Sequence, residues 1–81
     1  MRIDKFLNSV NITKRRSVAQ DMLSNKVVEI NNVVVKPSKN VEVGDTITIK
    51  YLNETKSYEV LQIPTTKSTP KSLQGEYIKE L

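Results

Sequence analysis

The chain has 81 residues, of which 37% are hydrophobic, and it carries a net charge of +4 without histidine or cysteine. These values indicate one small domain with a modest core and give no basis for a disulfide framework or for secretion. No run approaches the roughly 20 apolar residues of a membrane span, and the charged start differs from an apolar signal segment, so we expect a cytoplasmic protein that does not bind a membrane.

The first predicted element is a short helix over residues 3 to about 10. Its apolar positions recur at the spacing of one helical face, and they are Ile3, Phe6, Leu7 and Val10. Asp4 falls in the first turn, where the helix dipole favours a carboxylate. A helix this short depends on packing against the rest of the chain.

A second helix is predicted to begin near residue 15. Its apolar arc consists of Val18, Ala19, Met22 and Leu23, and its polar arc of Arg16, Ser17 and Gln20. Thr13 is a candidate N-cap. The helix ends around residues 24–26, where Asn25 is the residue expected to take a left-handed conformation.

Three cations, Lys14, Arg15 and Arg16, gather at the start of this second helix. Cations at a helix N-terminus cost the isolated helix about 0.3–1 kcal/mol each. A phosphate at the same place would reverse that penalty, because cations and backbone N–H groups would then both face it. The cluster therefore indicates that this segment binds a polyanion.

The middle of the chain has the pattern of an antiparallel sheet. Two β-branched runs, residues 27–30 and 33–35, flank Asn31-Asn32, and asparagine tolerates the positive φ of a tight hairpin turn. A third strand follows a turn at residues 41–45, with Ile47, Ile49 and Tyr51 on one side. A second hairpin turn is predicted at residues 53–56, and a fourth strand at residues 57–63.

Residues 64–81 are predicted to form a polar linker and a short tail. Pro64 ends the fourth strand, and residues 65–72 are polar and aperiodic, as in a mobile linker or surface loop. For residues 73–81, a short strand, a helical turn and a loose tail all remain open. We therefore predict an α+β fold, with two or three short helices packed on a four- or five-stranded antiparallel sheet and with residues 1–63 as the binding domain.

Catalysis has little support in this sequence. Histidine and cysteine are absent, the carboxylates have no paired spacing, and two glycines, Gly44 and Gly75, cannot form a phosphate-cradling loop. We expect no catalytic residue, no metal site and no cofactor.

The positive charge is concentrated in the first half of the chain. Residues 1–40 hold eight Lys/Arg against three Asp/Glu, whereas residues 41–81 hold five against six. This asymmetry indicates a cationic face for nucleic acid, although a solvated lysine-rich surface is the alternative. Phe6 lies on the core stripe, so phosphate contact and shape recognition of structured RNA fit better than base stacking. Charge alone does not exclude DNA.

Several segments in combination resemble the S4-type RNA-binding domain family. They are Arg2-Ile3-Asp4-Lys5-Phe6-Leu7, then Lys14-Arg15-Arg16-Ser17-x-Ala19, then Val28-x-Ile30-Asn31, Lys36-Pro37-Ser38 and Val41-x-x-Gly44-Asp45-x-Ile47. Over its whole length the chain is most similar to the short stand-alone members that act in bacterial ribosome quality control and to the small heat-shock S4 proteins. Three positions depart from the family pattern. The family often has a Ser or Thr cap where Arg15 stands and usually has Gly where Lys26 stands. Asn32 replaces the Gly of the family's Asn-Gly turn.

The resemblance implies an S4-like, or alpha-L, fold with an L-shaped RNA-binding face of two helices. Arg2, Lys5 and Arg16 would contact the RNA backbone, and Asp4 would hold the first helix or orient Arg16. The full set of residues expected at the RNA consists of Arg2, Asp4, Lys5, Lys14, Arg15, Arg16, Ser17, Gln20 and Lys26.

The resemblance also implies a target, the large ribosomal subunit that still carries peptidyl-tRNA after a stalled ribosome splits. The protein would contact ribosomal RNA and tRNA as a monomer, beside a second quality-control factor, and assist non-templated tailing of the trapped chain. The alternatives are a heat-shock-type S4 protein that recycles large subunits, a general RNA chaperone, an appendage of an RNA-modifying enzyme and a protein adaptor.

Overall fold

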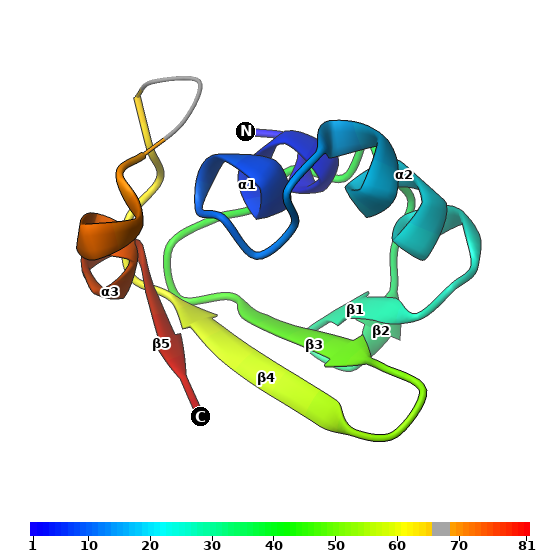
Figure 1. The fold of residues 1–81 in the computed structure, drawn as a ribbon. Helices are drawn as coiled ribbons and strands as arrows, with labels where there is room; N and C mark the ends of the chain where they lie inside the picture. Colours follow the sequence, from blue (N-terminus) through cyan, green and yellow to red (C-terminus); the bar gives the residue numbers. More distant parts are fainter. Residues whose placement is uncertain (66–68) are drawn as a thin grey trace.

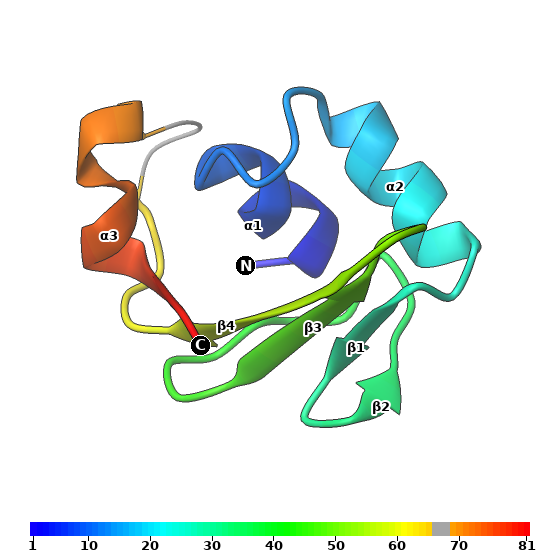
Figure 2. The ribbon, with the colours of Figure 1, turned by 60° about the horizontal axis from the view of Figure 1, so that its bottom comes forward.

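The computed structural model describes residues 1–65 and 69–81, so residues 66–68 of the polar segment predicted at 65–72 lie outside the described residues. Within these ranges, one five-stranded antiparallel sheet with the strand order β2-β1-β3-β4-β5 is covered on one face by two helices (Figures 1 and 2). A third, very short helix lies beside β5. The predicted α+β architecture is confirmed.

The two covering helices are α1 (Ile3–Ser9) and α2 (Arg16–Ser24). The predicted stripe of α1 is buried, with Ile3, Phe6 and Leu7 each at 0% exposure. In α2 the predicted arc is only partly correct, because Ala19 and Leu23 are buried but Val18 is 44% exposed. α2 is only nine residues long and packs against α1, so the buried arc of its surface is narrower than the arc predicted from the sequence spacing.

Both helices end in the same left-handed motif. The N–H groups of Asn11 and Ile12 donate to the carbonyls of Asn8 and Leu7, and those of Lys26 and Val27 donate to Leu23 and Met22. The positive φ falls on Asn11 (64°) and Lys26 (60°). The prediction that Asn25 is left-handed is therefore wrong: Asn25 has φ −83° and its Nδ2 donates to the Asp21 carbonyl.

The sheet begins with a hairpin of β1 (Val28–Ile30) and β2 (Val33–Val34). Both residues of its turn have positive φ, at 51° for Asn31 and 69° for Asn32, which confirms the predicted two-residue turn. Val28 and Ile30 are buried on the helix side, as their alternation predicts.

The central strands are β3 (Thr46–Lys50) and β4 (Thr55–Val60), and Ile47 and Ile49 of β3 are fully buried. Their turn lies earlier than predicted, because Tyr51 N–H donates to the Glu54 carbonyl at 2.7 Å and β4 starts at Thr55. Tyr51 is 38% exposed and lies beyond the end of β3.

The C-terminal residues form a 3-10 turn (Lys71–Leu73), α3 (Gln74–Tyr77) and β5 (Ile78–Glu80), which pairs with β4. Thr69 N–H and Oγ1 donate to the Ser9 carbonyl at 3.0 and 2.9 Å, and Gln74 Nε2 donates to the Val10 carbonyl at 2.6 Å. This segment therefore fastens the C-terminal end of α1. Among the described residues, none of the helices has the length and apolar character that crossing a bilayer requires.

Candidate nucleic-acid interface

One buried carboxylate organises the predicted site. The Asp4 side chain has no exposed surface, and its Oδ2 accepts hydrogen bonds from Arg2 Nη2 at 3.2 Å, from Arg16 Nε and Nη2 at 3.4 Å and from Gln20 Nε2 at 3.1 Å. Its Oδ1 accepts the Lys5 backbone N–H at 2.7 Å. The predicted pairing of Asp4 with Arg16 is present, and it joins α1 to α2.

These partners make it possible for a charged group to be buried at this position. Burial raises the pKa of Asp4, but the hydrogen bonds from Gln20 and the Lys5 N–H, together with the charges of Arg16 and Arg2, outweigh it, so that the pKa lies below the ordinary 3.8. Asp4 is therefore ionised at neutral pH. An acceptor-only carboxylate in this place holds its three side-chain donors in fixed directions.

The acid does not neutralise the arginines completely. Two guanidinium groups share one carboxylate, which leaves a local charge of +1, and the side chains of Arg2 and Arg16 are 48% and 44% exposed. Each arginine has five N–H donors in a planar fork, and only one or two of them point at Asp4. The remaining donors can reach an anion from solvent.

The start of α2 adds further positive charge and free donors. Arg15 is the N-cap residue, with φ −136° and no side-chain capping bond, and Ser17 is exposed in the first turn. The prediction of Thr13 as the N-cap is wrong, because Arg15 occupies that position, whereas Thr13 is buried and its Oγ1 has no hydrogen-bond partner among the described residues. An uncapped helix start beside Arg15 and Arg16 can accept an anionic group.

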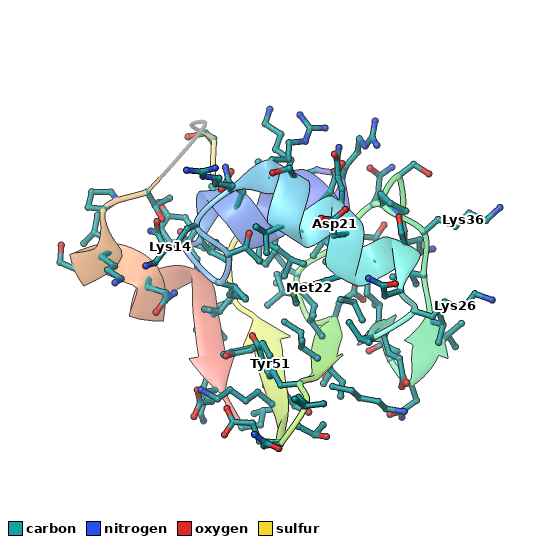
Figure 3. All side chains as sticks on the ribbon, turned by 45° about the vertical axis from the view of Figure 1, so that its right-hand side comes forward. Lys14, Asp21, Met22, Lys26, Lys36 and Tyr51 are labelled. Atoms are coloured by element: carbon teal, nitrogen blue, oxygen red, sulfur yellow. The ribbon has the colours of Figure 1, made fainter. Side chains whose placement is uncertain are left out.

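Two predicted residues lie away from this centre. Figure 3 shows Lys14 on the side of the molecule near α3, whereas Lys26 extends from the opposite end of α2, beside Lys36. The structure thus brings together Arg2, Asp4, Arg16 and Gln20 by direct contact, and it places Lys5, Arg15 and Ser17 next to them in the chain. Lys14 and Lys26 stand at the two ends of this surface.

Two cations that were not among the predicted site residues lie beside α1. The segment of residues 36–40 runs along the start of this helix, since Ile3 N–H donates to the Lys39 carbonyl at 2.7 Å and Asp4 N–H donates to Pro37 at 3.4 Å. Lys36 and Lys39 are both exposed there. The Lys36-Pro37-Ser38 signature was the available signal, but it does not reveal that this segment returns to the first helix.

This arrangement can bind an anion but offers no ligand set for a metal. Among the described residues, no three Asp or Glu side chains come close enough to hold an ion. Positive side chains and free backbone N–H groups converge over α1 and α2, where they suit a phosphate polymer better than a small substrate. The site thus defines a small α+β domain with a cationic surface on two helices.

Comparison with known proteins shows to which family of RNA-binding domains this chain belongs. The family model of the S4 domain matches residues 1–47, and the chain belongs to the S4 domain family. Across 78 residues, 96% of this chain and 93% of the relative, it is 47% identical to the RQC P-site tRNA stabilizing factor of Helicobacter pylori strain J99. It is 30% identical to the Bacillus subtilis protein of the same name, over 99% of this chain and 94% of that one.

Two solved structures have the same fold over the whole chain. The first, described as a trimeric structure of Vibrio cholerae Heat Shock Protein 15, has a TM-score of 0.90 and 28% identity, and covers 100% of this chain and 81% of that one. The second, a solution structure of hypothetical protein HP1423, has a TM-score of 0.87 and 44% identity, with coverage of 100% and 96%. The resemblance inferred from the sequence motifs is confirmed.

Proposed function

We propose that this protein binds ribosomal RNA and tRNA on the large ribosomal subunit during bacterial ribosome-associated quality control. The observation that carries the proposal is the pair of half-exposed arginines, Arg2 and Arg16, held by the buried Asp4. Relatives named RQC P-site tRNA stabilizing factor, which match nearly the whole chain, supply the setting.

The proposed contacts follow from the surface of the two helices. Arg2 and Arg16 bind neighbouring phosphates in the centre, while Lys5, Arg15 and Ser17 extend the contact along the RNA backbone. Gln20 and Asp4 act as positioning residues, because both are committed to the hydrogen bond between them. Lys14 and Lys26, at the two ends of α2, reach more distant phosphates. Recognition then depends on the shape of a folded RNA.

In this role the protein is a cytoplasmic, non-catalytic factor that acts as a monomer. It holds peptidyl-tRNA on the obstructed subunit and thereby assists non-templated C-terminal tailing of the stalled chain. A second quality-control factor on the same subunit supplies the remaining steps. A protein of this kind stabilises a bound state and needs neither a cofactor nor a metal.

The test is sedimentation of the tagged protein with split large subunits, followed by sequencing of the co-purified RNA. We expect the protein and tRNA to sediment together with large-subunit RNA. Arg16→Glu should abolish this association, and Lys79→Glu should not, because Lys79 is an exposed residue of β5 with the same charge. Co-sedimentation with intact small subunits or free messenger RNA would reject the quality-control role, and full binding by the Arg16→Glu protein would reject the site.

A second candidate is a heat-shock-type S4 protein that recycles large subunits. The observation in its favour is the TM-score of 0.90 to Heat Shock Protein 15. The two roles differ in their product, since only quality control yields trapped chains with untemplated C-terminal residues. Mass spectrometry of nascent chains from cells with and without the protein distinguishes them.

A further inference from the structure

The outer strand of the sheet carries an apolar patch outside the cluster of residues around Asp4. β2 is the edge strand, at the end of the sheet away from β5 (Figure 2). Val33 and Val34 of β2 are 63% and 46% exposed. A hollow of ≈ 410 Å³ lies between Val34, Val35 and Pro37 on one side and Leu23 at the end of α2 on the other. We call this surface the β2 edge groove.

In the part of the chain that the structure describes, no strand pairs with the outer side of β2. In the register of the hairpin, Ile30 pairs with Val33 and Glu29 with Val34, and Val35 N–H donates to the Val28 carbonyl at 3.4 Å. Along an antiparallel pair, alternate residues turn their N–H and C=O groups toward the partner strand. Since Val33 and Val35 face β1, the N–H and C=O of Val34 point outward. Such an edge can accept one more strand.

The rim of the groove is positive at the α2 end. Lys26 and Lys36 line the hollow, and Figure 3 shows both extending from this end of the molecule. Within residues 1–65 and 69–81, neither they nor Lys39 take part in an ion pair. Glu42 and Asp45 lie beyond the 33–39 segment and line another hollow, next to Ile30 and Val33. The charges therefore favour an acidic occupant near α2.

We propose that the β2 edge groove binds an extended acidic and apolar segment of a partner protein by strand addition. Main-chain hydrogen bonds form to Val34, alternate apolar side chains of the segment enter the hollow beside Val34 and Leu23, and its carboxylates meet Lys26, Lys36 and Lys39. The proposal does not depend on the RNA-binding role, and Lys26 is common to the two proposed surfaces.

Charge and surface chemistry favour an acidic peptide over two other occupants of the groove, a second copy of this chain and RNA. A second copy of the chain, with a net charge of +4, would offer residues 31–39 to the same edge, and this segment contains two lysines and no carboxylate. RNA phosphates would satisfy the lysines, but they would leave the exposed valines and the free strand edge without partners. An acidic peptide strand satisfies all three features together.

Titration of peptides into the ¹⁵N-labelled full chain, followed by NMR, tests the proposal. The probes are a synthetic hexapeptide of alternating Glu and Val and its Lys/Val counterpart. We expect only the acidic peptide to bind, with shifts at residues 26 and 33–39 and slower hydrogen exchange of the Val34 N–H. Val34→Pro removes the outward donor without breaking the ladder to β1 and should abolish binding. Lys36→Glu with Lys39→Glu should weaken it about tenfold.

The same spectra provide the outcomes that would overturn the proposal. Equal binding of the basic peptide, or no shifts with either peptide, excludes an acidic strand partner. Concentration-dependent shifts at Val33 and Val34 without peptide show that the occupant is a second copy. Shifts at residues 33–39 on addition of large-subunit RNA, as large as those at Arg2 and Arg16, show that the groove belongs to the RNA surface. Arg16→Gln should leave peptide binding unchanged, and this variant separates the two surfaces.

Discussion

Gln20 Nε2 lies 3.1 Å from Asp4 Oδ2, so a residue in the middle of α2 is bonded to a residue in the first turn of α1. The same oxygen accepts hydrogen bonds from the side chain of Arg16, which lies one turn earlier in α2. The crossing of the two helices and the direction of their cations are therefore fixed by one acid. Changes at Asp4 should affect both the folding and the binding of the protein.

We expect Asp4→Asn to lower the free energy of unfolding by about 1–2 kcal/mol, because hydrogen bonds to a charged group are lost in a buried place. This loss of stability is smaller than is usual when one partner of a buried ion pair is removed, because both arginines are half exposed and can be solvated. Urea denaturation measures it. Asp21→Asn is the matched control on the exposed side of α2 and should change the free energy by less than about 0.5 kcal/mol. Equal effects of the two substitutions would contradict the role of Asp4.

The lowered pKa of Asp4 predicts a loss of stability in acid. The folded carboxyl has a pKa below the ordinary 3.8, so its contribution is fully present above that value and disappears as the pH falls through the folded pKa. Thermal unfolding of the natural protein and of Asp4→Asn should differ by a constant amount above about pH 5 and converge below it. A gap that widened in acid would mean that burial dominates and the pKa is raised.

RNA affinity should depend on salt in proportion to the number of phosphates bound. If about five cations contact phosphates, the logarithm of the affinity for large subunits falls with the logarithm of the salt concentration with a slope of roughly −3 to −5. Arg2→Gln should make that slope shallower by about 0.7–0.9. Lys79→Gln, with the same charge change on β5, should leave the slope as it is. A slope near zero would indicate that binding does not proceed through phosphates.

Replacement of Lys26 should reveal strain at the end of α2. A residue with a Cβ atom at φ 60° destabilises the folded state by about 1–2 kcal/mol. Glycine removes this strain but loses more backbone entropy on folding, so the net gain in stability is smaller. We expect Lys26→Gly to raise the free energy of unfolding by about 0.5–1 kcal/mol. Lys26→Asn keeps a residue that tolerates this φ and removes the charge as well. If both variants are stabilised and lose RNA affinity equally, the charge of Lys26 contributes to binding.

The C-terminal segment should support α1. Gln74→Ala removes the donor to the Val10 carbonyl and should cost about 0.5–1.5 kcal/mol. Hydrogen exchange should become faster at the end of α1 and in β5. Gln62→Ala, at an exposed position after β4, is the control and should leave these rates unchanged. If the rates in α1 do not respond to Gln74→Ala, the hydrogen bond makes no contribution to its stability.

The parts of this structure that follow from local pattern were predictable. The stripe of Phe6 and Leu7 and the Asn31-Asn32 turn depend on neighbouring residues alone, and both are present. The Asp4–Arg16 contact followed from the family resemblance, because no spacing rule relates residues on two different helices. The nine residues proposed for RNA contact as a set remain a prediction, as does the boundary at residue 63.

The errors arise where tertiary contacts decide the outcome. The Asn25 side chain bonds back to the helix, which moves the left-handed position onto Lys26 against its own preference. Lys39 lies beside Ile3 through a main-chain bond across thirty-six positions of sequence, and side-chain patterns do not encode such a bond. For residues 73–81 the sequence left a strand and a helical turn open, and the structure contains both.

The sharing of Asp4 by Arg2 and Arg16 also has an entropic consequence. A free arginine side chain loses about 2 kcal/mol of rotamer freedom when it is immobilised on a ligand. In this protein folding has already restricted both arginines, so a polyanion meets two partly immobilised guanidinium groups instead of two mobile ones. The side chains are thus largely ordered during folding, and association with a polyanion of matching shape can be fast and selective.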